Sequence, residues 1–117
     1  MSQNLRKGNS EMNRLTTEQM TRISKTIEVP EVGRIVLVDV SGQKDDQLED
    51  HNQNIYCIDE IGNIKWQIQA DSTIQERDSF TYLFRDDKGM IHAERFFGNE
   101  FIIDPIIGKA ELTEWHK

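Results

Sequence analysis

The chain has 117 residues, of which 36% are hydrophobic and 30% are charged. This length supports one hydrophobic core but not two, so we predict a leader at residues 1–20 and a single domain at residues 21–117. No apolar run approaches the roughly 20 residues of a membrane-spanning helix, and residues 1–20 lack the apolar stretch of a secretory signal. The sequence therefore predicts a cytoplasmic protein without a membrane anchor.

Charge is distributed unevenly along the chain. Residues 1–33 contain five basic and four acidic residues, whereas residues 34–117 contain nine basic and seventeen acidic residues, a net charge of −8. A domain this acidic repels nucleic acids and anionic membranes and favours a basic protein partner. The alternative interpretation is that the charge only keeps the protein soluble.

The N-terminal residues are polar, which is typical of a flexible leader. Thr16 and Gln19 have the spacing of a capping box, so a short helix at this point is the alternative to disorder. From residue 22 to residue 29, β-branched and polar residues alternate. This pattern predicts a strand, with a continued helix as its alternative.

A turn and a second strand follow. Pro30 and Gly33 are typical turn residues, and the continuous apolar run in residues 34–40 predicts a strand that is covered on both faces. Residues 41–53 form the longest polar connection, and residues 70–78 form another. A connection of the first length is either functional or merely mobile.

Three hairpins are predicted in the rest of the chain, with turns at residues 59–62, 86–89 and 104–108. Each turn begins with Asp, whose side chain can accept a backbone hydrogen bond, and ends with Gly, which tolerates positive φ. Alternation within the flanking strands predicts that six side chains form the core: Ile64, Trp66, Phe80, Tyr82, Phe101 and Ile103.

Three further residues are informative about burial. Cys57 is the only cysteine and lies within an apolar run, which predicts a buried thiol and excludes an internal disulfide. Phe96 and Phe97 are adjacent, so within a strand they would point to opposite faces and one would be exposed. Taken together, the hairpins predict an all-β protein: an antiparallel meander of seven or eight strands, as an open twisted sheet or small sandwich, with a flexible or partly helical leader.

One motif occurs twice. Ile55–Asp59 with Gly62 and Trp66 is followed by a second copy at Phe101–Pro105 with Gly108, and the Asp residues of the two copies are 45 positions apart. Both copies resemble the blade hairpin of the pyrroloquinoline-quinone-type β-propeller repeat. The resemblance implies consecutive antiparallel hairpins in a twisted sheet or in two stacked sheets. A closed ring needs at least about four blades of roughly 40 residues, which this chain does not supply, so no quinone-site residue is carried over.

The candidate functional residues are four carboxylates and one histidine in the connection at residues 41–53. Their spacing does not match a calcium-binding loop, and no second His or Cys has ligand spacing, so we predict no metal site. A solvated acidic loop is one interpretation, and a surface that attracts a basic partner is the other. The residues of this predicted partner-binding cluster are Asp45, Asp46, Glu49, Asp50 and His51.

No residue pattern predicts catalysis or a cofactor. His92 lies in a strand without a recognisable nucleophile, and the glycines do not form a phosphate-binding loop. We therefore expect a non-catalytic protein-binding module. Its size, acidity and hairpin style resemble those of bacterial immunity-type proteins, which implies neutralisation of a basic toxin. The alternative is a self-assembling structural β-module related to propeller blades, whose open sheet edges pair with other copies; the oligomeric state is left open.

Overall fold

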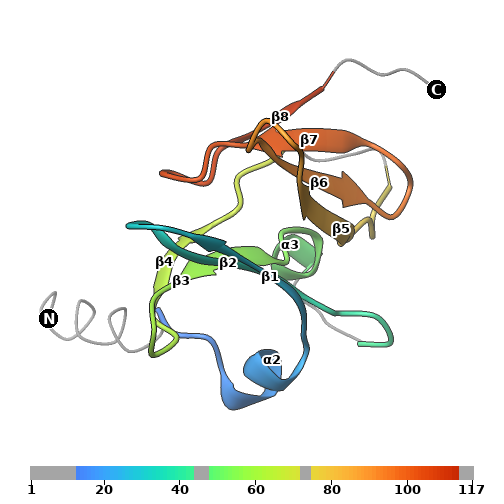
Figure 1. The fold of residues 1–117 in the computed structure, drawn as a ribbon. Helices are drawn as coiled ribbons and strands as arrows, with labels where there is room; N and C mark the ends of the chain where they lie inside the picture. Colours follow the sequence, from blue (N-terminus) through green and yellow to red (C-terminus); the bar gives the residue numbers. More distant parts are fainter. Residues whose placement is uncertain (1–12, 44–47, 72–74, 114–117) are drawn as a thin grey trace, which may run out of the picture.

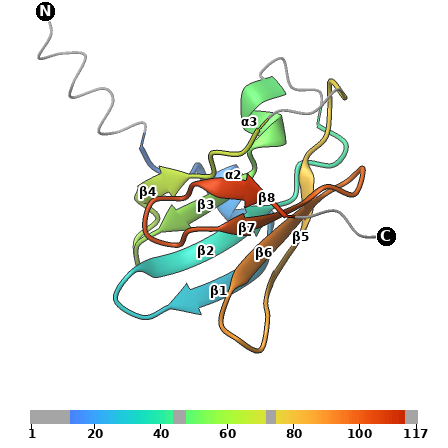
Figure 2. The same ribbon diagram turned by 90° about the horizontal axis from the view of Figure 1, so that it is seen from above.

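The computed structural model describes residues 13–43, 48–71 and 75–113, and it consists of two four-stranded antiparallel sheets (Figure 1). In each sheet the strands follow one another in sequence order, as a meander. Seen from above, the second sheet lies across the first (Figure 2). The predicted all-β meander of hairpins is confirmed, in the form of a small open sandwich.

The element bounds follow the predicted hairpins closely. The first sheet contains β1 (Ile23–Val29), β2 (Gly33–Val38), β3 (Ile55–Ile58) and β4 (Ile64–Gln67). The second sheet contains β5 (Phe80–Arg85), β6 (Ile91–Arg95), β7 (Glu100–Ile103) and β8 (Ala110–Leu112). Two short helices are described, α2 (Thr17–Thr21) and α3 (Leu48–Asn52). No helix in the described ranges has the length and apolar character needed to cross a bilayer.

The three predicted Asp-to-Gly turns are confirmed. The amide of Gly62 donates to the carbonyl of Asp59 at 3.2 Å, and the equivalent bonds in the other two turns measure 3.0 and 2.8 Å. Gly62, Gly89 and Gly108 all have positive φ. A fourth turn, which the sequence analysis missed, joins β6 to β7 and closes with the amide of Gly98 donating to the carbonyl of Arg95 at 2.9 Å.

Strand β2 is buried on both faces, as predicted. Ile35 and Leu37 belong to the main core between the sheets, whereas Val36 and Val38 belong to a second apolar cluster on the outer side of the first sheet. Alternating side chains of one strand thus serve two cores, which explains the uninterrupted apolar run.

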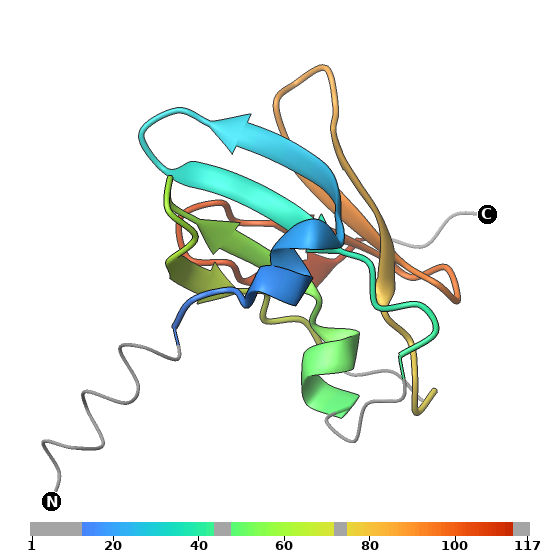
Figure 3. The same cartoon turned by 90° about the horizontal axis from the view of Figure 1, so that it is seen from below.

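The N-terminal segment packs on this second cluster. Leu15 is only 5% exposed and lies among the apolar side chains of β2 and β3. The predicted capping box is confirmed: the Gln19 amide donates to Thr16 Oγ1 at 3.0 Å, and the Thr16 amide donates to Gln19 Oε1 at 2.8 Å. In Figures 1 and 3, α2 lies against the side of the first sheet that faces away from the second. The predicted leader is therefore packed from residue 13 onward, and residues 1–12 lie outside the described ranges.

Two β-bulges overturn part of the predicted core. A bulge between Phe80 and Tyr82 turns Tyr82 outward, where it is 61% exposed, and brings Leu83 into the core in its place. A second bulge opposite Cys57 and Ile58 places Ile64 against the second cluster, while Trp66 faces the main core. Each bulge inserts one residue and reverses the alternation beyond it. Phe80, Phe101, Ile103 and the Cys57 thiol are buried as predicted.

Trp66 connects the two copies of the repeated motif. Its Nε1 donates to the carbonyl of Pro105 at 2.9 Å, so the first copy contacts the turn of the second. A Cβ atom added to Gly108 would lie 2.4 Å from the indole, which means that only glycine allows this contact. Close by, the amide of Gln69 donates to the carbonyl of Gly108, and the two sheets are joined along this corner.

A buried arginine, Arg95, holds α3 and the connection before β5 to the second sheet. Arg95 is 1% exposed, stacks over the ring of Phe80 at 4.3 Å, and donates to the carbonyls of Asn52 and Asp78 at 2.7 and 2.6 Å. Burial lowers the pKa of Arg95, and the charge of Asp78 partly opposes this effect. Asn54 adds hydrogen bonds to the backbones of Val38 and Phe80. These contacts attach α3 and the connection before β5 to the strand ends.

Candidate functional site

The outer face of the second sheet is covered by no element of the described ranges. We define this outer face by eight residues whose side chains alternate with the buried ones of β5 to β8 and the adjoining turn: Tyr82, Phe84, Asp86, His92, Glu94, Glu100, Ile102 and Glu111. Strand pairing sets seven of them in two rows, and Asp86 lies in the turn after β5. One row contains Phe84, His92, Ile102 and Glu111, and the other contains Tyr82, Glu94 and Glu100.

His92 lies at the centre of the outer face between two carboxylates. Its Nε2 is 2.7 Å from Asp86 Oδ2, and its Nδ1 is 2.7 Å from Glu100 Oε2. Its ring is stacked on Phe84, with 4.8 Å between centroids and 2° between planes. Because each ring nitrogen faces a carboxylate oxygen, both contacts are hydrogen bonds only when the imidazole carries both protons.

The pKa of His92 reflects this geometry. Partial burial alone would lower the pKa, but the hydrogen bonds and negative charges of Asp86 and Glu100 outweigh it, and the pKa is raised above its ordinary value. The hydrogen bond from His92 is the largest cause of the lowered pKa of the Asp86 carboxyl. The site therefore favours a charged imidazolium beside an ionised Asp86.

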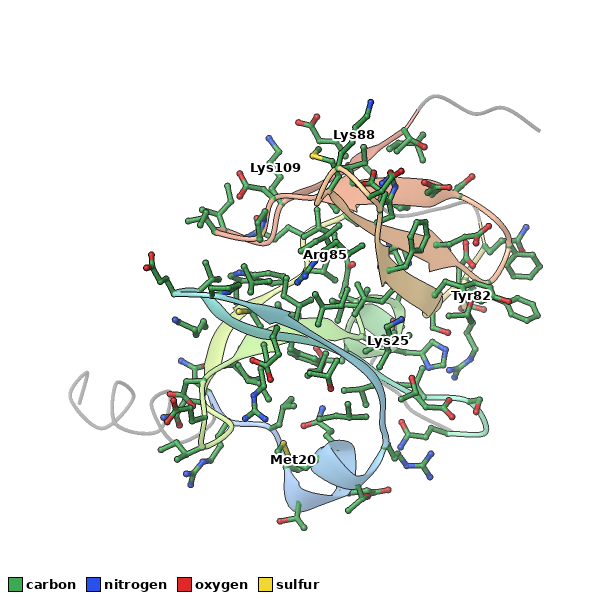
Figure 4. The ribbon with its side chains drawn as sticks, in the orientation of Figure 1. Met20, Lys25, Tyr82, Arg85, Lys88 and Lys109 are labelled. Atoms are coloured by element: carbon green, nitrogen blue, oxygen red, sulfur yellow. The ribbon has the colours of Figure 1, made fainter. Side chains whose placement is uncertain are left out.

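Negative charge dominates the outer face. It contains four carboxylates, and His92 is the one basic residue among its eight members. Two lysines of the second sheet, Lys88 and Lys109, lie in its hairpin turns (Figure 4). Tyr82 projects from β5, opposite Glu94 in the strand register (Figure 4). An exposed aromatic side chain among carboxylates is suited to contact a cationic group.

A groove of about 680 Å³ adjoins the outer face between the β5–β6 and β7–β8 turns. Ile102 and Glu111 belong to both the groove and the outer face. Met90, which is 45% exposed, also lines the groove. An apolar depression thus borders the acidic surface.

A second groove of about 740 Å³ lies at the turn end of the first sheet and is more polar. Its two cations are already engaged: Arg34 Nη2 donates to the carbonyls of Asp59 and Glu60 at 3.1 and 3.2 Å, and Lys65 Nζ donates to the carbonyl of Val32. We therefore assign these cations a structural role in holding the β1–β2 and β3–β4 turns.

The predicted acidic cluster is only partly described. Asp45 and Asp46 lie outside the described ranges, and Glu49 belongs to α3 without a described side chain. Asp50 is exposed and accepts a hydrogen bond from Gln67 Nε2 at 3.3 Å. His51 is 8% exposed, so its ring lies in the protein interior rather than on a surface that a partner would contact. The connection that holds them is partly helical, since it contains α3. This helix was not predicted from the sequence.

The outer face was missed because its members are far apart in sequence. The sequence signal that could have revealed it is a glutamate in each of three successive strands: Glu94, Glu100 and Glu111. These residues come together only when the strands pair. Phe96 and Phe97 also differ from the prediction: they occupy the β6–β7 turn, and both are exposed. In the described part of the chain, no group of three or more His, Cys, Asp or Glu side chains is arranged to hold a metal ion.

The chain matches a known protein family. A family model described as Domain of unknown function (DUF7957) matches residues 9–115, which is nearly the whole chain. No curated protein and no solved structure matches.

Proposed function

The chain belongs to the family described as Domain of unknown function (DUF7957), and we propose that it is a non-catalytic module that binds a basic protein. The observation that carries this proposal is the uncovered outer face of the second sheet, where four carboxylates surround aromatic side chains. A partner of positive charge complements this surface.

Binding would proceed through attraction followed by anchoring. Clustered carboxylates accelerate the encounter with a cationic protein and orient it. Tyr82 then supplies a large, exposed and nearly rigid contact of the kind that often dominates interface energies. An arginine side chain of the partner would stack on its ring and reach the adjacent carboxylates.

We assign the module an inhibitory role of the immunity type, in which it occludes the basic surface of a toxin or nuclease. Occlusion needs a rigid, complementary surface and no reacting group. The two cores and the Trp66 link support rigidity. The single buried thiol of Cys57 supports a reducing compartment, and we place the protein in the cytoplasm.

The self-assembly alternative is less well supported. The edge of β4 is occupied at its start by residues 13–15, through the bonds Leu15 N to Gly62 O and Ile64 N to Asn13 O. Beyond its end, Gln69 pairs with Lys109. Two outer faces of the same negative charge would also repel each other. These features favour a partner of different chemistry over a second copy.

Affinity capture with matched variants tests the proposal. The face variant is E94K/E111K, and the control is E28K/E60K, which makes the same charge change at exposed positions of the first sheet. A protein that is retained by the wild type and the control but lost from the face variant is then purified. Calorimetry of the purified pair should show an affinity loss of at least about tenfold for the face variant and weaker binding at high salt. An acidic partner, or equal losses in both variants, would contradict the proposal.

A further inference from the structure

We infer that the partner docks an extended segment that carries a basic side chain and an aliphatic side chain about four residues apart. The basic side chain lies over Tyr82, and the aliphatic side chain enters the groove beside Ile102. This inference rests on the proposed function and specifies the chemistry of the partner.

The position of the basic side chain follows from a comparison of the two rows. In the first row the chain supplies its own cation, because His92 stacks on Phe84 and contacts two carboxylates. The second row repeats the aromatic and acidic components as Tyr82, Glu94 and Glu100, but no lysine, arginine or histidine belongs to it. A cation from the partner would complete the second row in the way that His92 completes the first.

The position of the aliphatic side chain follows from the groove. Met90 and Ile102 give its wall an apolar surface, and Met90 is 45% exposed. Contiguous exposed apolar surface at the border of a polar face is typical of an interface. Charged groups at the rim, Asp104, Lys109 and Glu111, would remain in contact with water while the centre is filled.

Sheet geometry gives the separation. Tyr82 lies in β5 and Ile102 in β7, two strands and one row apart in the register. With strands ~4.8 Å apart and same-face residues ~6.7 Å apart, the two positions are about 12 Å apart. An extended chain advances ~3.3 Å per residue and covers this distance in three or four residues. Successive side chains of an extended chain point to opposite sides, so only the separation of about four places both side chains on the sheet. A helical segment advances only ~1.5 Å per residue and would need about eight.

Synthetic peptides can test the separation directly. Each has a Gly/Ser background, one Arg and one Leu, with one to eight positions between the two, and is titrated into the ¹⁵N-labelled full chain while amide shifts are recorded. We expect the tightest binding when Arg and Leu are four residues apart, about fivefold tighter than when they are three or eight residues apart. Replacing Arg by Gln or Leu by Ser should remove this advantage.

Variants of the protein separate the two contacts. M90S should remove the dependence on Leu and keep the dependence on Arg. E94Q should do the opposite. I61S, at an exposed position of the first sheet, is the matched control and should leave both unchanged.

The outcomes also distinguish this inference from the proposed function. Binding that requires Arg but is independent of separation and of M90S overturns the inference and leaves the proposed function intact. Peptides that bind equally well without Arg, or no shifts with any peptide, overturn both. An optimum near eight would replace the extended segment by a helix and also overturn the inference.

Discussion

The two sheets are built alike, yet their outer faces differ completely. Each is a four-stranded meander, and the repeated motif occupies the last hairpin of both. The outer face of the first sheet presents apolar side chains such as Val36 and Ile58, and residues 13–21 cover it. The outer face of the second presents carboxylates and aromatic rings, and no described residue covers it. The comparison shows that whether a sheet face is covered by another segment, rather than how its strands are arranged, determines whether its side chains are apolar or polar.

The largest expected effect is loss of the link between the sheets. Trp66→Ala removes a buried indole and its bond to Pro105, and should lower the free energy of unfolding by about 3–5 kcal/mol. Urea denaturation measures the change, with I61A at an exposed site as the control. A loss below about 1 kcal/mol would mean that the indole does not stabilise the sandwich.

The next effect tests the cover of the first sheet against the open face of the second. Leu15→Ala leaves a cavity in the second cluster and should cost about 2–4 kcal/mol of unfolding free energy. Tyr82→Ala removes an exposed ring and should change stability by no more than about 0.5 kcal/mol. Thermal and urea unfolding of the pair check both values. Similar losses at the two sites would erase the distinction between a covered and an open face.

The smallest effect concerns pH. The pKa of His92 is raised in the folded state, so its contribution to stability is complete below its unfolded value of about 6.5 and is lost as pH rises through the folded pKa. From pH 6.5 upward, wild-type stability should fall by about 0.5 kcal/mol relative to H92Q, a size set by partial solvent exposure. Urea denaturation at a series of pH values gives the slope. Parallel pH profiles for both proteins would show that His92 contributes nothing.

Asp86 acts at the opposite end of the pH range. Its folded pKa is lowered, so its contribution is present above an unfolded value of about 3.9 and is lost as pH falls through the folded pKa. The H92Q variant should lose part of this acid-side dependence, because the hydrogen bond from His92 is its largest cause. In H92Q, the slope of unfolding free energy against pH should therefore change both near neutral pH and at acid pH.

Local chemistry made much of the fold predictable. The Asp-to-Gly turns, the capping box at Thr16 and the doubly buried β2 are each set by residues within a few positions of one another. The side-chain directions of Tyr82 and Ile64 were not predictable in this way. A bulge inserts one residue without a distinctive composition, and period-two alternation then assigns the wrong face beyond it.

The outer face was less accessible to prediction than the fold. Its carboxylates are ordinary polar positions when each strand is considered alone, and they form a surface only after β5 to β8 pair. The acidic connection at residues 41–53 was predicted as the partner-binding site because its charges are adjacent in sequence. The position of His51 inside the protein could not be inferred, since burial of that ring depends on tertiary packing around α3.

The contact of Trp66 with Gly108 and Pro105 has a consequence for how the molecule holds together. Trp66 belongs to the part of the chain that forms the first sheet, Pro105 and Gly108 belong to the part that forms the second, and the main core draws apolar residues from both parts. Neither part is therefore a complete folding unit. Cleavage of the backbone between residues 71 and 78 would yield two fragments that acquire structure only in each other's presence.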